Sequence, residues 1–133
     1  MASILLVGAD TALLEGITQA LASAGHHVLT AATLAEAAFA TSSAPPLLAV
    51  IDRSLLANAT ELRGLGLAPR GALVVFGDPV TPLPGALRRA VLAELRLPLE
   101  RARLMALAAH VEARAQDTGR DAKPTPPESR PPQ

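Results

Sequence analysis

Three aspartates stand where their carboxylates could do chemistry, because each one follows a short apolar run. They are Asp10, Asp52 and Asp78. Carboxylates gathered at one place can hold a hard cation such as Mg²⁺, and two that come close together raise the pKa of one of them. The ordinary alternative is that such residues cap helices and shape turns. The turn reading is the better one for Asp78, which stands between Gly77 and Pro79.

Other residue types that could act in catalysis or bind a metal ion are absent or unsuitably placed. The chain has no cysteine, which excludes a thiol nucleophile, a disulfide framework and a cysteine zinc site. His26 and His27 are adjacent, so on a strand they point to opposite faces and cannot share a metal ion. With His110 on the last predicted helix, we interpret all three histidines as structural. There is no Gly-x-Gly-x-x-Gly motif and no Ser/His/Asp set at strand ends, so we expect no enzyme activity.

Composition excludes two classes of partner. Twelve basic and twelve acidic residues cancel, and only 2% of residues are aromatic. A neutral chain without stacking side chains is not expected to bind nucleic acid. No apolar run approaches the ~18 residues that a membrane span needs. We therefore expect a cytoplasmic protein with no membrane contact.

Short apolar runs alternate with helical patterns along residues 1–116. The predicted strands are Ile4–Val7, Val28–Thr30, Leu47–Ile51, Ala72–Phe76 and Leu92–Leu95. The first predicted helix begins at Asp10 or Thr11 and ends before Gly25. The next three cover Thr33–Thr41, which begins with a capping box, about Thr60–Leu67, and Ala86–Val91. The last predicted helix begins at Pro98, and its apolar face consists of Leu99, Leu104, Leu107, Ala108 and Val111.

This order predicts an α/β fold. The strands read as continuous apolar runs rather than alternating ones, which is typical of strands covered on both faces. We therefore expect one domain, a doubly wound (βα)5 three-layer sandwich around a central five-stranded parallel sheet. In such sheets function lies at the carboxyl ends of the strands. Residues 117–133 carry five prolines and six charges and no Leu, Val, Ile or Phe, which predicts a disordered Pro-rich tail.

The chain resembles the receiver domain of two-component response regulators, which has the flavodoxin-like fold. Ile4–Val7 and the stretch Ser23–Val28 resemble the family's first strand, first helix and second strand. Leu47–Asp52 resembles its third strand, so the resemblance implies that Asp52 stands at the phosphoryl-accepting position. Arg96-Leu97-Pro98 stands where the family has a Lys-Pro pair.

The resemblance also shows what is missing. The two acids that hold Mg²⁺ in the family fall on Gly8 and Ala9, and Asp10 comes one residue later. The hydroxyl after the fourth strand falls on Gly77, and the lysine after the fifth falls on Leu97. The family's switch aromatic falls near Glu94. The only lysine in the chain, Lys123, lies in the predicted tail. We therefore expect no Mg²⁺ and no other cofactor.

These departures predict a degenerate receiver, or pseudo-receiver, that acts in signalling through phosphorylation-independent protein–protein interaction. Phosphoryl transfer depends on positioning and on stabilising spread negative charge, and the groups that do this are missing. Two alternatives stay open. One is a working response regulator phosphorylated on Asp52. The other is a sensor that binds a small ligand in the emptied site.

The resemblance implies a partner face over about residues 86–113, either for another protein or for a second copy of the chain. Arginines outnumber acids in this stretch, so the face is expected to be basic and to suit an acidic partner surface. The arginines of this face are Arg88, Arg89, Arg96, Arg101 and Arg103. The alternative is a solvated helix face on which Glu100 pairs locally with Arg101 or Arg103.

Overall fold

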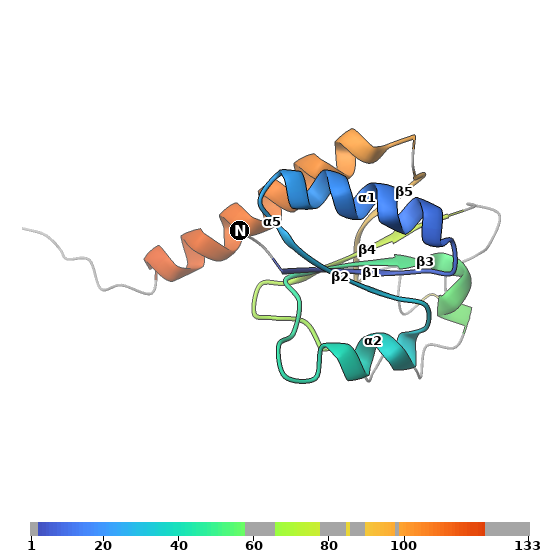
Figure 1. Cartoon of the computed structure of the whole chain (residues 1–133). Helices are drawn as coiled ribbons and strands as arrows, with labels where there is room; N and C mark the ends of the chain where they lie inside the picture. Colours follow the sequence, from blue (N-terminus) through green and yellow to red (C-terminus); the bar gives the residue numbers. More distant parts are fainter. Residues whose placement is uncertain (1–2, 58–65, 78–84, 86–89, 98, 122–133) are drawn as a thin grey trace, which may run out of the picture.

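A computed structural model describes residues 3–57, 66–77, 85, 90–97 and 99–121 of the chain. These residues form a five-stranded parallel sheet of order β2-β1-β3-β4-β5, with helices on both faces (Figure 1). The predicted three-layer α/β architecture is confirmed. The elements are β1 (Ser3–Val7), α1 (Thr11–Ser23), β2 (His27–Ala31), α2 (Leu34–Ala40), β3 (Leu48–Asp52), the 3-10 helix η1 (Arg53–Ala57), β4 (Ala72–Phe76), β5 (Val91–Leu95) and α5 (Arg101–Asp121).

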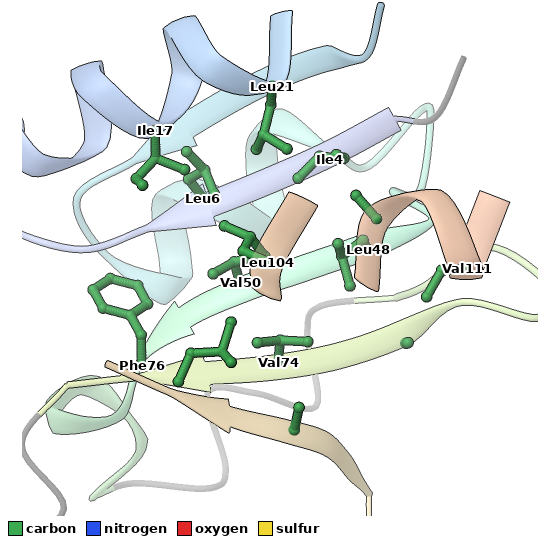
Figure 2. Close-up of a cluster of buried hydrophobic side chains, with 14 of the residues drawn as sticks. Ile4, Leu6, Ile17, Leu21, Leu48, Val50, Val74, Phe76, Leu104 and Val111 are labelled. Atoms are coloured by element: carbon green, nitrogen blue, oxygen red, sulfur yellow. The ribbon is translucent and has the colours of Figure 1, made fainter. Parts of the chain in front are cut away.

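The core has two halves, one on each face of the sheet. On one face α1 and α5 cover the larger cluster (Figure 2), which includes Ile4, Leu6, Ile17, Leu21, Leu48, Val50, Val74, Phe76, Leu104 and Val111. On the other face the smaller cluster lies against α2 and η1 and includes Leu5, Val7, Leu34, Ala37, Ala49, Ile51, Leu56 and Val75. Consecutive residues of β1, β3 and β4 alternate between the two clusters, which is why their runs are apolar throughout.

Local signals fix the ends of the first two helices as predicted. Asp10 is the N-cap of α1, and its Oδ1 accepts a hydrogen bond from the Leu13 N–H at 3.1 Å. Gly25 follows the helix with a φ of +92°, a conformation that glycine adopts without the steric cost of a Cβ. Thr33 caps α2 by accepting from the Glu36 N–H at 3.1 Å. The Glu36 carboxylate in turn accepts from the Ala32 N–H.

The structure differs from the sequence-based prediction at the last helix. The helix begins at Arg101 rather than Pro98, because Glu100 provides the first carbonyl, which accepts from the Leu104 N–H at 3.1 Å. Leu99 therefore precedes the helix and is 84% exposed, so its placement on the apolar face is wrong. The helix also runs to Asp121, past residue 117 where the tail was predicted to begin. Backbone i→i−4 bonds can continue a helix without burying apolar residues.

Other differences concern the middle of the chain. The 3-10 helix η1 directly after β3 was not predicted, and residues 66 and 67, the described end of the expected Thr60–Leu67 helix, are not helical. Strand β5 begins at Val91, which the sequence had assigned to the end of a helix. Residue 90 of the expected 86–91 helix is in a turn, while residues 86–89, Pro98 and residues 122–133 lie outside the described residues. No helix in the described part of the chain has the length and apolar character needed to cross a bilayer.

Candidate functional site

Three of the predicted site positions meet at the carboxyl edge of the sheet. Gly8 follows β1, Asp52 ends β3 and Gly77 follows β4. A methyl carbon attached at Gly8 would lie 3.6 Å from the Asp52 Cβ, and one attached at Gly77 would lie 3.3 Å from the Asp52 Oδ1. Asp52 therefore has the two glycines as immediate neighbours. The strand order places them there, because β3 lies between β1 and β4.

The Asp52 side chain makes a local hydrogen bond to the backbone. Its Oδ1 accepts a hydrogen bond from the backbone N–H of Ser54 at 3.0 Å, a turn of the Asx type that leads from β3 into η1. The side chain is half-buried rather than exposed. The carboxylate oxygen nearest to Gly77 is thus already engaged in a local structural bond.

An aromatic ring lies close to the place that the resemblance assigns to a metal-binding acid at Gly8. A methyl carbon at Gly8 would meet the Phe76 Cζ at 3.2 Å and the Leu14 Cδ2 at 3.7 Å. Phe76 is only 4% exposed and belongs to the larger core cluster, where Figure 2 shows its ring at the end of β4. A contact of 3.2 Å is tight for carbon atoms, which pack best at about 3.5–4.0 Å. A larger side chain at position 8 therefore requires the ring to move.

On the other side of Asp52, an arginine lies across Gly77. A methyl carbon at Gly77 would lie 3.2 Å from the Arg53 Cγ and 3.6 Å from the Arg53 Cδ, so the arginine stem occupies the place of a side chain at position 77. Gly77 also has a φ of +126°, where an L side chain would be strained. The hydroxyl that the resemblance implies after the fourth strand has no room here in this conformation.

The Arg53 guanidinium reaches across β4 to strand β5. Its Nη1 donates to the Glu94 Oε1 on β5 at 2.7 Å. The arginine side chain is 8% exposed and the glutamate side chain 52% exposed. Charge-assisted bonds of this length are among the stronger ones in proteins. The position where the resemblance expects a mobile switch aromatic is thus occupied by a carboxylate in an ion pair.

The described residues lack a cluster of metal-ligating side chains. They contain no group of three or more carboxylate, histidine or cysteine side chains placed to share a metal ion. Ala9 offers no side-chain oxygen, and the Asp10 Oδ1 is used as the helix cap. That Asp10, Asp52 and Asp78 gather a cation stays a prediction, because Asp78 lies outside the described residues.

Leu97 belongs to another part of the surface. It packs against the core cluster under α1 and α5. It also lines an open groove of about 390 Å³ together with Asp10, Ala12, Leu13, Gly16, Ile17 and Arg101. A second, smaller hollow of about 180 Å³ includes Gly8, but neither hollow is lined by Asp52 or Gly77.

The described part of the expected partner face carries three arginines. Arg96, Arg101 and Arg103 are all exposed. Arg103 pairs with Glu100 at 3.3 Å, which is the local pairing that the sequence offered as the alternative. The Arg96 backbone N–H donates to the Glu100 carboxylate at 2.7 Å, and this bond holds the pKa of Glu100 below its usual value. Arg88 and Arg89 lie outside the described residues.

Comparison with known structures gives one consistent result. No family model matches the chain, and no curated protein matches its sequence significantly. A response regulator receiver domain from Clostridium thermocellum superposes with a TM-score of 0.70 over 87% of this chain and 98% of its own, at 20% identity. A CheY-like receiver domain from Methylobacillus flagellatus gives a TM-score of 0.69 over 84% and 98%, also at 20% identity.

This chain has the receiver-domain fold. A further match is the receiver domain of a sensor histidine kinase from Pseudomonas aeruginosa, with a TM-score of 0.60 and 23% identity over 80% of this chain and 93% of that one. That structure holds a magnesium ion in its active-site cleft. The receiver fold is therefore shared, while the space beside Asp52 in this chain is filled by Phe76 and Arg53.

Sequence reasoning identified the two glycines and missed the side chains that fill their places. Phe76 was seen only as the end of a strand, and Arg53 was not singled out. A signal for Arg53 was present, since an arginine directly follows an otherwise apolar strand. Its path across β4 depends on the strand order, which single-residue patterns do not contain.

The filled space predicts opposite effects for the same substitution at two glycines. Gly8→Ala should lower the free energy of unfolding by about 1–3 kcal/mol, because the added methyl overpacks against the Phe76 ring. Gly16→Ala in α1 should raise it by about 0.5–1 kcal/mol, because nothing lies within 4 Å of the added methyl and alanine favours the helix. Urea denaturation of both variants measures this. An unchanged or raised stability for Gly8→Ala would show that the site has free space.

Proposed function

We propose that the chain is a pseudo-receiver, which works in a signalling or regulatory pathway by binding protein partners without a phosphorylation switch. The observation that carries this proposal is the packing around Asp52. The Phe76 ring lies against Gly8, and the Arg53 stem lies across Gly77. Both neighbours that a working receiver would use to hold a phosphoryl group are replaced by close packing.

The chemistry of phosphoryl transfer supports this reading. The transferred group spreads negative charge over its oxygens, and catalysis rests on placing cations and donors around it. Arg53 is the cation adjacent to Asp52 in sequence, but its Nη1 is directed to Glu94 on β5. The Asp52 Oδ1 is held by Ser54. An aspartyl phosphate at this position would form slowly and be poorly stabilised.

The same packing argues against Mg²⁺ and against an enzyme. The acid pair implied by the resemblance is replaced by Gly8 and Ala9, and a longer side chain at position 8 would collide with Phe76. We therefore propose that the protein acts without a bound metal or other cofactor. The filled space equally counts against a small ligand in the same place, since the larger groove described above lies beside α1 and Leu97 instead.

The surface around the start of α5 is the best candidate for partner binding. Leu99 is 84% exposed, and exposed Arg96 and Arg101 lie next to it in the chain. Arginine is enriched at protein interfaces, and an exposed apolar side chain near it adds area that a partner can bury. The chemistry suits a partner with an acidic, partly apolar surface, which includes a second copy of the chain as one possibility.

The proposal predicts that Asp52 resists chemical phosphorylation. After incubation with a small-molecule phosphodonor and excess Mg²⁺, the intact mass should show no stoichiometric gain of about 80 Da, the mass of one HPO₃ group. A working receiver domain serves as the positive control in the same buffer. A full adduct that disappears in the Asp52→Ala variant would contradict the proposal and favour a working response regulator.

Affinity for an identified partner tests separately whether Asp52 takes part in binding and whether the surface around the start of α5 does. Asp52→Asn should leave the affinity unchanged, because the carboxylate takes no part in switching. Leu99→Asp combined with Arg101→Glu should weaken it by at least about tenfold, the size of effect expected at an interface centre. Phe39→Asp on α2, also at an exposed apolar residue, is the matched control and should have no effect. Equal affinities for all variants would reject this face.

A further inference from the structure

Among the described residues, Arg53 is a buried charged side chain that the proposed interaction does not use. Its side chain is 8% exposed, although an arginine normally keeps its guanidinium in water. Its neighbours explain how it stays there. The stem lies on the backbone of Gly77, and the head donates to the Glu94 carboxylate, which is itself 52% exposed. The charge is therefore compensated at the point where it reaches the surface.

The sheet register shows what this side chain connects. Arg53 directly follows β3, in which Asp52 pairs with Phe76 of β4. Glu94 pairs with Val75 of β4 from the other side. The arginine thus spans β4 at its carboxyl end and joins β3 to β5, which is an edge strand of the described sheet. Only a residue without a side chain at position 77 leaves this path open.

The pair has a mechanical consequence for β5. The register between β4 and β5 is irregular between Leu73 and Val74, so their ladder is interrupted near its start. At the carboxyl end, the Gly77 N–H donates to the Leu95 carbonyl at a long 3.3 Å. The 2.7 Å ion pair lies at this weaker end. Removing one partner of a buried charged bond costs more than an ordinary hydrogen bond, because it leaves the other charge poorly solvated.

We propose that Arg53 and Glu94 form a fixed strut that holds β5 in a single position against β3, in place of a movable switch. The inference rests on the proposed function, since a strut of this kind suits a partner surface that is always displayed. It assigns a role to Gly77 as well, which is to let the Arg53 stem cross β4. The strut acts on the strand that leads to the exposed Leu99 and Arg101.

Hydrogen exchange followed by NMR tests the strut directly. Arg53→Met keeps the apolar stem and removes the charged donor, and Glu94→Met removes the acceptor on the other side. Both should speed the exchange of the protected amides of Val91–Leu95 and of Gly77 by at least about tenfold, while the amides of β1 keep their rates. Arg103→Met is the matched control, because it breaks the exposed pair with Glu100 and should leave β5 unchanged.

Combining the two substitutions should add nothing beyond Arg53→Met alone, because both remove the same bond. Unchanged β5 amides would overturn the strut. So would an equal acceleration in every strand, since the pair would then contribute only general stability. If Arg53→Met does not fold, Glu94→Met decides, because residue 94 has its side chain half in solvent and the substitution leaves no acceptor for Arg53. Phosphodonor treatment of the unmodified chain reports on Asp52 alone, so either proposal can fail while the other stands.

Discussion

The arginine that crosses the sheet at Gly77 is the contact on which the character of this site depends. A receiver fold places the ends of its strands side by side, and in this chain the place beside the third-strand aspartate is taken by the Arg53 stem. The guanidinium then needs an anion, which Glu94 provides on the next strand. Gly77, Arg53 and Glu94 therefore belong together, because the absence of a side chain at Gly77 leaves room for the Arg53 stem and Glu94 balances the arginine charge.

On the opposite side of Asp52, packing of another kind has the same effect. Phe76 fills the space over Gly8 with its ring and is buried with the core residues of α1 and α5. A metal-binding carboxylate there would have to push the Phe76 ring back from a 3.2 Å contact and would place a charge beside the core, which costs both packing and desolvation. The site has therefore become an extension of the hydrophobic core on one side and an ion pair on the other. Asp52 remains as a residue that shapes the turn into η1.

Much of the fold could be predicted from the sequence, because it is encoded locally. The runs Ile4–Val7 and Ala72–Phe76 are apolar throughout, and strands buried on both faces must be so. Asp10 and Thr33 are cap residues that act within one turn of chain. The prediction that Leu99 lies on the apolar helix face was wrong, because its spacing fits that face but the helix begins only after Glu100. An apolar residue before a helix start has the same sequence appearance as one in its first turn.

The candidate site could be predicted only as a set of missing groups. The positions of Gly8 and Gly77 follow from strand ends, and their neighbourhood with Asp52 follows from the parallel order. The side chains that lie beside Asp52 could not be predicted from the sequence, because Phe76 contacts the Gly8 position across β3 and Arg53 pairs with Glu94 across β4. Contacts between strands that are not sequence neighbours depend on the completed sheet.

The packing around Asp52 is expected to leave an aspartyl phosphate at this position slow to form and poorly stabilised. The most direct measurement is an amide NMR titration with Mg²⁺ and then with beryllofluoride, a mimic of an aspartyl phosphate. The filled site predicts no saturable shifts at Asp52, Gly77 or Gly8 in a well-folded sample. Saturable shifts at these residues that extend to Val91–Leu95 would show that Phe76 and Arg53 can withdraw, and they would contradict the account.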